Sequence, residues 1–352
     1  MFWPFALAVK AGEAGFDLLR RNVEYLEEVE KTQVARPHPV WATPNRTALE
    51  LHTLTLRDFS TASAPPVLIL PPYAGHTSTI ADFHEGQSLV RALRDNGCLQ
   101  LFAIDWRSAT ERMQHYDVDD YLAELNVVVD ELGGCVALVG LCQGGWCAAL
   151  YAARYPRKVA RLVLAGAPID TAVGQGAIKD AAQALPMNFY EGLVRSGGGL
   201  LRGAYMLEGF KNMHPKEQYL GKFVELYEHM DDPSYVERFN QFERWYESTV
   251  DLPGAWYLQV IQQLFKENRF ARGQFVGLGK RLDLKDVTCP TYLLAGVEDD
   301  ITPKEQVFAA EALLGSTEVV KTLAPGGHIG LFMSHKVLRD LWPAIAAWLV
   351  KS

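Results

Sequence analysis

Residues 136–156 read "VALVGLCQGGWCAALYAARYP" and decide the fold, because an apolar run changes there into a glycine-rich turn. The continuous apolar run up to Gly140 predicts a fully buried β-strand. Glycines at 140 and 144 permit a tight strand-to-helix turn, with a helix expected to start near Gln143. Such a turn projects the residue between the glycines, Cys142, at the carboxyl end of a sheet. We therefore predict that Cys142 is a nucleophile, with an ordinary buried cysteine as the alternative.

Strand-like runs alternate with helical stretches on both sides of this turn. Helices are expected at about 80–96 and 119–133 and near 336–350. The strand-like runs are "LELHTLTLRDF" (49–59), "PVLILPP" (66–72), "LQLFAIDW" (99–106), "CVALVGL" (135–141), "RLVLAGAPI" (161–169), "TYLLAGVEDD" (291–300) and "VVKTLAPGGH" (319–328). This alternation predicts the α/β class, with a mostly parallel central sheet covered by helices on both faces.

The alternation is interrupted between residues 171 and 284, where the sequence contains aromatic helical stretches. We expect a mostly helical lid there, inserted between two parts of one α/β core at 41–170 and 285–352. The glycines of "SGGGLL" (196–201) are expected to form a flexible connection. Six aromatic residues of this lid are candidates for an apolar channel, with ordinary core packing as the alternative for each: Tyr205, Phe210, Phe223, Tyr227, Trp245 and Trp256.

Residues 1–40 are predicted to contain an amphipathic helix, because apolar residues recur on one face between positions 16 and 29. This helix is expected to pack on the main domain or on a second copy of the chain. The alternative is docking on a lipid or polymer surface, with Phe2, Trp3 and Phe5 as anchors.

Composition excludes several classes of function. A net charge of −8 among 352 residues argues against nucleic acid as a partner. The sequence contains no apolar run of about 18 residues or more, so no membrane span is expected. The five cysteines, an odd number, resemble neither a disulfide framework nor a zinc site, so we expect a reducing, cytoplasmic location. No metal motif or cofactor-binding loop is present, and no cofactor is implied.

Two further residue types complete a candidate catalytic triad. Asp299 and Asp300 follow one predicted strand, and His328 follows the next, in the order nucleophile, acid, histidine. The histidine would take the thiol proton, and an aspartate would hold the orientation of its ring. The spacing does not decide between the two aspartates.

Other residues are expected near this triad. An oxyanion hole needs two backbone N–H groups, which we assign to Gln143 and to Tyr73 in the turn "PPYAGHT". Three more residues are expected to border the pocket: His76, Trp106 and Asp300. For each of the three, a structural role is the alternative.

Several longer motifs resemble the superfamily of polyhydroxyalkanoate synthases and intracellular polyhydroxyalkanoate depolymerases. These are "GLCQGG", "IDWR" followed by "DVDDYLAEL", and "STVDLPGAWYLQVIQQLFKENRFARGQF". The resemblance runs from about residue 40 to the C-terminus. It implies an α/β-hydrolase fold in which Cys142 is the nucleophile, Asp299 the acid and His328 the base.

The resemblance does not by itself separate the branches of the superfamily. "PPYAGHTSTI", "VEDDITP" and "GGHIGLFMS" favour a depolymerase, whereas "CQGG" and the chain length favour a synthase. The first expectation is hydrolysis of a 3-hydroxybutyrate-type polyester through an acyl-cysteine. The alternatives are a synthase that polymerises 3-hydroxyacyl coenzyme A, another acyl hydrolase or thioesterase, and a non-catalytic granule-associated scaffold. The implied partners are a polyester or hydroxyacyl substrate, a polymer granule surface and a second copy of the chain.

Overall fold

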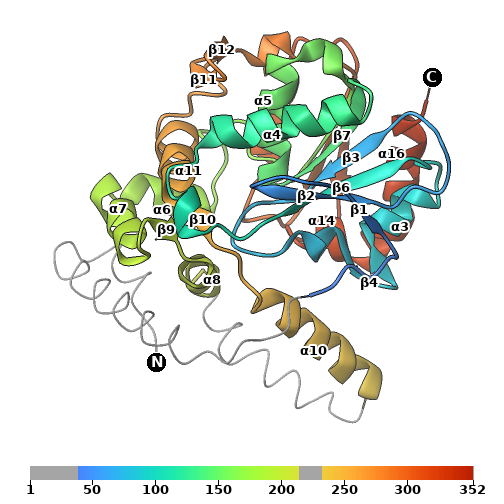
Figure 1. Cartoon of the computed structure of the whole chain (residues 1–352), viewed down its shortest axis with the longest axis horizontal. Helices are drawn as coiled ribbons and strands as arrows, with labels where there is room; N and C mark the ends of the chain where they lie inside the picture. The colour runs from blue at the N-terminus through green and yellow to red at the C-terminus, as the bar shows by residue number, and fades with distance from the viewer. Residues whose placement is uncertain (1–38, 214–231, 352) are drawn as a thin grey trace.

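An eight-stranded sheet forms the centre of the molecule. The computed structural model describes residues 39–213 and 232–351. The strands are β1 (Arg46–Glu50), β2 (Leu54–Asp58), β3 (Val67–Leu70), β6 (Leu101–Trp106), β7 (Val136–Leu141), β8 (Val159–Ala165), β13 (Thr291–Gly296) and β14 (Val319–Ala324). Their spatial order is β1-β2-β6-β3-β7-β8-β13-β14, and β2 runs antiparallel to both of its neighbours, while the strands from β6 to β14 are parallel (Figure 1). The predicted fold class is confirmed.

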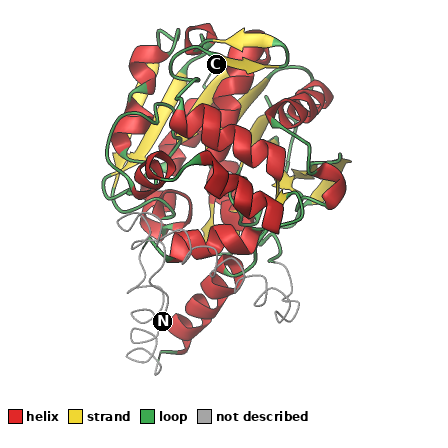
Figure 2. Ribbon diagram, turned by 90° about the vertical axis from the view of Figure 1, so that its left-hand side faces the viewer, coloured by secondary structure: helices red, strands yellow, loops and turns green. Residues whose placement is uncertain are grey.

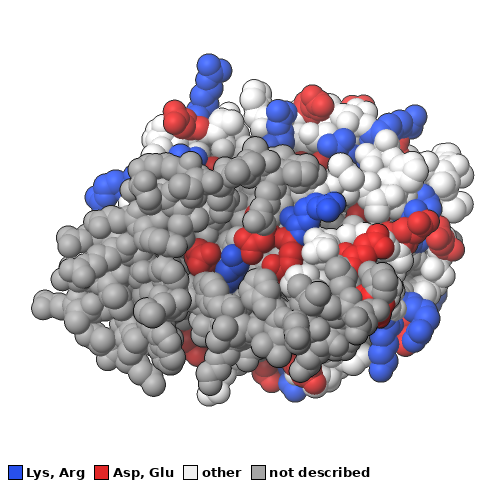
Figure 3. Space-filling view, turned by 90° about the horizontal axis from the view of Figure 1, so that it is seen from below, with Lys and Arg blue, Asp and Glu red and all other residues white. Residues whose placement is uncertain are grey.

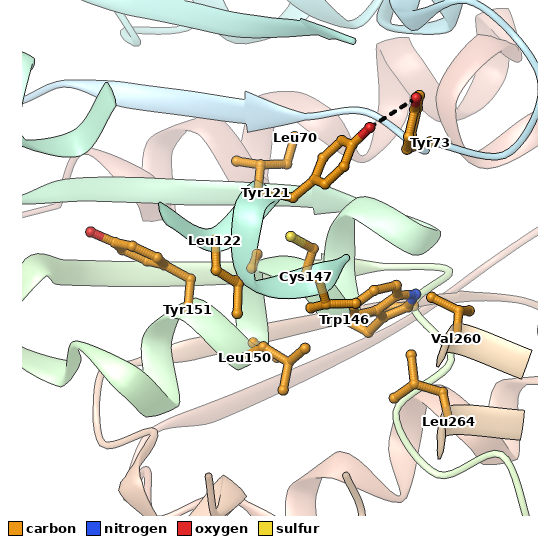
Figure 4. Packing of buried hydrophobic residues seen from close by; sticks show 14 of the residues in the cluster. Leu70, Tyr73, Tyr121, Leu122, Trp146, Cys147, Leu150, Tyr151, Val260 and Leu264 are labelled. Atoms are coloured by element: carbon orange, nitrogen blue, oxygen red, sulfur yellow. Dashed lines mark hydrogen bonds between the residues drawn. The ribbon is translucent and has the colours of Figure 1, made fainter. Parts of the chain in front are cut away.

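Apolar side chains alternate between the two faces of the sheet, and helices cover both faces. In β3, Leu68 and Leu70 pack in one cluster with α4 (Val118–Glu131) and α5 (Gln143–Arg154). Val67 and Ile69 pack in a second cluster with α3 (Leu89–Arg94) and α16 (Trp342–Leu349). Figure 4 shows part of the first cluster, including Leu70, Tyr121, Leu122, Trp146 and Leu150. Continuously apolar strands are therefore required because both faces are buried.

In the described residues between β8 and β13, helices are the main elements. These helices are α6 (Ala177–Ala184), α7 (Met187–Ser196), α8 (Gly203–Lys211), α10 (Pro233–Tyr246) and α11 (Gly254–Gln259), followed by the π-helix η5 (Val260–Lys266). We call these the insertion helices. They gather beside one end of the sheet, and α10 projects away from the body (Figures 1 and 2). The predicted boundaries at 170 and 284 stay predictions, and the predicted N-terminal helix lies in residues 1–38, outside the described part of the chain.

The helix expected at 80–96 is much shorter than predicted. Only α3 is helical there, and it follows the short elements η1 (Ser78–Ala81), β4 (Asp82–His84) and β5 (Gln87–Ser88). The reason is the buried carboxylate of Asp82, which accepts hydrogen bonds from the backbone and hydroxyl of Thr43 at 2.7 and 2.8 Å and from the Ser88 hydroxyl. Ser88 also caps α3 by accepting from the Arg91 N–H. The chain therefore folds around Asp82 before the helix begins.

Three other local expectations need correction. The closing helix is broken into α15 (His335–Asp340) and α16, since Pro343 near the start of α16 has no N–H to continue a single helix. The run 49–59 spans parts of β1 and β2, with a turn between them. The glycines of 196–201 form a packed turn, where a Cβ on Gly197 would lie 2.1 Å from the Leu200 oxygen. This turn leads into β9 (Leu200–Leu201), which pairs with β10 (Leu252–Pro253), so it is not a flexible connection.

The turn from β7 to α5 is a tight junction of the core. Cys142 has φ 51° and ψ −118°, a backbone conformation that L-residues rarely adopt. A Cβ on Gly140 would lie 2.4 Å from the Cα of Gly145, and one on Gly144 would lie 2.0 Å from the carbonyl oxygen of Leu70. The start of α5 can therefore rest directly on the end of β3 only because these positions carry no side chain.

Gly144→Ala is expected to lower the free energy of unfolding by about 3 kcal/mol or more, because its methyl group overlaps backbone that cannot move aside. Denaturant unfolding of the purified chain measures this. The matched control is Gly192→Ala in α7, where a Cβ meets nothing within 4 Å and removal of a helical glycine is expected to raise stability by up to about 1 kcal/mol. Equal stability of the Gly144→Ala variant and the native chain would contradict the steric account.

Candidate active site

Three predicted residues follow the carboxyl ends of strands in the same half of the sheet. Cys142 follows β7, Asp299 follows β13, and His328 follows β14. Because β7, β8, β13 and β14 are parallel, the loops after them emerge at one edge of the sheet. Cys142 and His328 both line a cavity at this edge, and the Asp299 side chain is buried behind His328.

Asp299, rather than Asp300, contacts the histidine. Its Oδ2 lies 2.7 Å from Nδ1 of His328, and its Oδ1 accepts hydrogen bonds from the backbone N–H groups of Ile301 and Thr302 at 3.1 and 2.8 Å. The carboxylate is thereby held in place on both oxygens. Asp300 lines the cavity instead, and its carbonyl oxygen accepts from the N–H of Ala177.

The pKa of His328 depends on its neighbours Cys142 and Asp299. Burial alone would lower its pKa, but electrostatic interactions with Cys142 and with the Asp299 carboxylate raise the pKa well above the usual 6.5. The ring is also packed edge-on against Phe332 at a centroid distance of 5.6 Å. The arrangement therefore favours the protonated form of His328.

The two residues predicted for an oxyanion hole differ in their surroundings. Gln143 is the first residue of α5 and lines the cavity beside Cys142. The Tyr73 side chain does not line the cavity. Its hydroxyl lies near the carbonyl oxygens of Arg107 and Asp251. The same hydroxyl accepts a hydrogen bond from Tyr121 (Figure 4). Pro71 and Pro72 have no N–H, so the first backbone N–H group after β3 belongs to Tyr73. The role of both residues stays a prediction.

The cavity has a volume of about 720 Å³ and mostly apolar walls. Four of the six aromatic residues predicted for the lid line it: Tyr205, Phe210, Trp245 and Trp256. Phe223 and Tyr227 lie outside the described residues. Six other aromatic residues of the insertion helices, which the sequence did not single out, also line the cavity: Phe189, Tyr190, Phe242, Tyr246, Tyr257 and Phe265. Their aromatic character was visible, but helical spacing alone could not show which faced inward.

Of the three residues expected to border the pocket, His76 and Asp300 line the cavity, whereas Trp106 does not. The Trp106 indole N–H donates to the carbonyl oxygen of Pro71 at 2.8 Å, and its ring packs against Tyr73 and Tyr121. The position of Trp106 at the end of a strand led us to expect it at the border of the pocket, but its side chain packs in the core. The expectation for Trp106 is therefore wrong.

Some broader features also bear on the site. Within residues 39–213 and 232–351, no group of three or more histidine, cysteine or acidic side chains could hold a metal ion. No helix in the same ranges has the length and hydropathy needed to cross a membrane. All five cysteines are free thiols. On the visible, described part of the face in Figure 3, acidic and basic side chains are intermingled.

Several sequence relatives of the chain are named as polymerases. The chain is 30% identical over 301 residues to poly(3-hydroxyalkanoate) polymerase subunit PhaC of Synechocystis, covering 81% of this chain and 78% of that protein. It is 29% identical to the subunit of the same name from Allochromatium vinosum, with 81% of each chain covered. The subunit from Haloferax mediterranei is 28% identical, with 95% of this chain and 71% of that protein covered.

Solved structures resemble the chain in fold. A Paleococcus ferrophilus monoacylglycerol lipase matches with a TM-score of 0.54 at 17% identity, covering 85% of this chain and 99% of that one. A carboxylesterase structure from Nitrososphaera gargenis matches with a TM-score of 0.54 at 14% identity, covering 87% and 98%. The family model described as "Protein of unknown function (DUF3141)" matches residues 53–347. The chain therefore belongs to this family, within the polyhydroxyalkanoate synthase superfamily of α/β-hydrolases.

Proposed function

We propose that the chain is an acyltransferase that takes a 3-hydroxyacyl group from coenzyme A onto Cys142 and passes it to the hydroxyl group of a growing polyester. The observation that carries this proposal is the contact of His328 with Asp299, together with the position of both His328 and Cys142 at the wall of one apolar cavity. The polymerase names of the relatives support the direction of the chemistry.

The first half-reaction would form the acyl-enzyme. The Cys142 thiolate attacks the carbonyl carbon of the thioester, and the sulfur–carbon bond to coenzyme A breaks as the new one forms. The imidazolium of His328 gives its proton to the departing coenzyme A thiolate. His328 is then neutral, with Nδ1–H held by Asp299, and one thioester has replaced another.

The second half-reaction would extend the polymer. Neutral His328 takes the proton of the chain-terminal hydroxyl, whose oxygen attacks the acyl carbon on Cys142. An ester bond forms, the bond to sulfur breaks, and the thiolate and imidazolium are restored. In both halves, the N–H of Gln143 and one N–H from the loop after β3 would stabilise the negative oxygen of the tetrahedral intermediate.

The comparisons favour this synthase alternative over the depolymerase that the sequence motifs first suggested. The reactivity of cysteine also favours the synthase, because a thiolate exchanges readily with a thioester, whereas an oxygen ester is a harder substrate for it. The apolar cavity would also disfavour water as the acceptor of the acyl group. Granule association, a homodimer and a cytoplasmic location stay predictions.

A paired assay tests the direction of the chemistry. With 3-hydroxybutyryl coenzyme A, the purified chain is expected to release coenzyme A and form polymer, while amorphous polyhydroxybutyrate granules release no soluble hydroxyacid. Cys142→Ala is expected to lower the release of coenzyme A about 10³-fold or more, because it removes the nucleophile. Turnover of granules that is lost in Cys142→Ala, without use of the thioester, would instead establish a depolymerase.

The two adjacent aspartates provide a matched pair of variants. Asp299→Asn is expected to lower kcat for release of coenzyme A by about 10²- to 10⁴-fold, because an amide in contact with Nδ1 no longer holds the productive tautomer of His328. Asp300→Asn, which leaves that contact intact, is expected to lower kcat by less than about tenfold. Steady-state kinetics on both variants measures this. An equal loss in both would show that Asp299 has no special role.

A further inference from the structure

His76 is a partly buried polar residue of the cavity that the proposed chemistry does not use. It lies on the loop after β3, and Leu70 of β3 pairs with Gly140 of β7, so this loop runs beside the turn that carries Cys142. The loop is fixed by a bridge between His76 and Thr249 and by a hydrogen bond from the N–H of Val250 to the Gly75 oxygen at 2.9 Å. His76 and Cys142 line the same cavity.

Aromatic rings of the insertion helices surround the imidazole. Its centroid lies 5.0 Å from that of Trp245, 5.2 Å from that of Tyr246 and 5.7 Å from that of Phe210. Burial lowers the pKa of His76 to about 4, an effect that the nearby backbone of Tyr246 and Ala74 only partly offsets. The ring is therefore neutral at neutral pH.

One polar atom of this ring has no internal partner. Nε2 is buried and meets no group at hydrogen-bond geometry within residues 39–213 and 232–351. A buried polar atom without a partner is costly, and a substrate group that enters the cavity can satisfy it. A neutral imidazole nitrogen either donates or accepts, depending on the tautomer. A hydroxyl group can do both, so it can pair with Nε2 in either tautomer.

We propose that His76 is a specificity-determining residue that forms a hydrogen bond through Nε2 with the 3-hydroxyl of the acyl group, and so selects hydroxyacyl over plain acyl thioesters. This inference rests on the proposed function for the identity of the substrate. The apolar walls around His76 accommodate the carbon chain, and the imidazole supplies a polar contact that distinguishes the two substrates.

Acylation kinetics test the inference. The native chain is expected to release coenzyme A from 3-hydroxybutyryl coenzyme A at a kcat/KM about tenfold or more above that for butyryl coenzyme A. His76→Phe is expected to abolish this preference while changing the value for butyryl coenzyme A less than about threefold. His76→Gln, which keeps a polar group, is expected to retain part of the preference. The control Phe210→Leu, which alters an apolar neighbour of the same ring, is expected to affect both substrates equally.

Binding separates this inference from the proposed function. In a Cys142→Ala background, which cannot form the acyl-enzyme, calorimetry compares the dissociation constants of the two thioesters with and without His76→Phe. A preference for the hydroxyacyl thioester that His76→Phe removes supports the inference, even if the native chain shows no acylation and the proposed function fails. Equal binding of both thioesters to the Cys142→Ala chain, or an equal loss for both on His76→Phe, overturns the inference whether or not acylation occurs.

Discussion

The close contact between the start of α5 and the end of β3 is the constraint on which the rest of the site depends. Gly144 lies against the Leu70 carbonyl, and Gly140 lies against Gly145, so a side chain at 140 or 144 would push the helix away from the sheet. With the helix held there, the connecting residue must adopt the positive φ of Cys142. The strain at this residue is offset by packing on both faces of the sheet. The same turn places the thiol where the loops after β13 and β14 can reach it.

Electrostatic contacts hold the residues of the candidate triad in place at this edge of the sheet. Asp299 has one oxygen occupied by two backbone N–H groups, which leaves the other for His328. Interactions with Cys142 and with the Asp299 carboxylate raise the pKa of His328 although burial alone would lower it. The insertion helices close the apolar cavity over this pair. An acyl group there would lie beside both Cys142 and His328.

Sequence alone could predict the parts of the fold that depend on local patterns. The apolar runs predicted the sheet, and the order of Cys142, Asp299 and His328 predicted which loops would meet. Local patterns failed where a distant contact decides the outcome, as at Asp82, whose bonds to Thr43 replace the expected helix. Trp106 was misplaced for the same reason, since its partner is the Pro71 carbonyl on another strand's loop. The sequence motifs did not separate the branches of the superfamily either, because both readings use the same three residues and differ in the acyl donor and acceptor, which no local pattern identifies.

The central claim is that Cys142 carries the acyl group, and rapid mixing followed by peptide mass spectrometry tests it most directly. The purified chain is mixed with 3-hydroxybutyryl coenzyme A, quenched in acid and digested. The account predicts one hydroxybutyryl group on the peptide that contains Cys142, and none on the peptides that contain only Cys98, Cys135 or Cys289. Cys147 is distinguished from Cys142 by fragmentation of their shared region. Release of coenzyme A with the acyl group absent from Cys142, or present on another cysteine, would contradict the account.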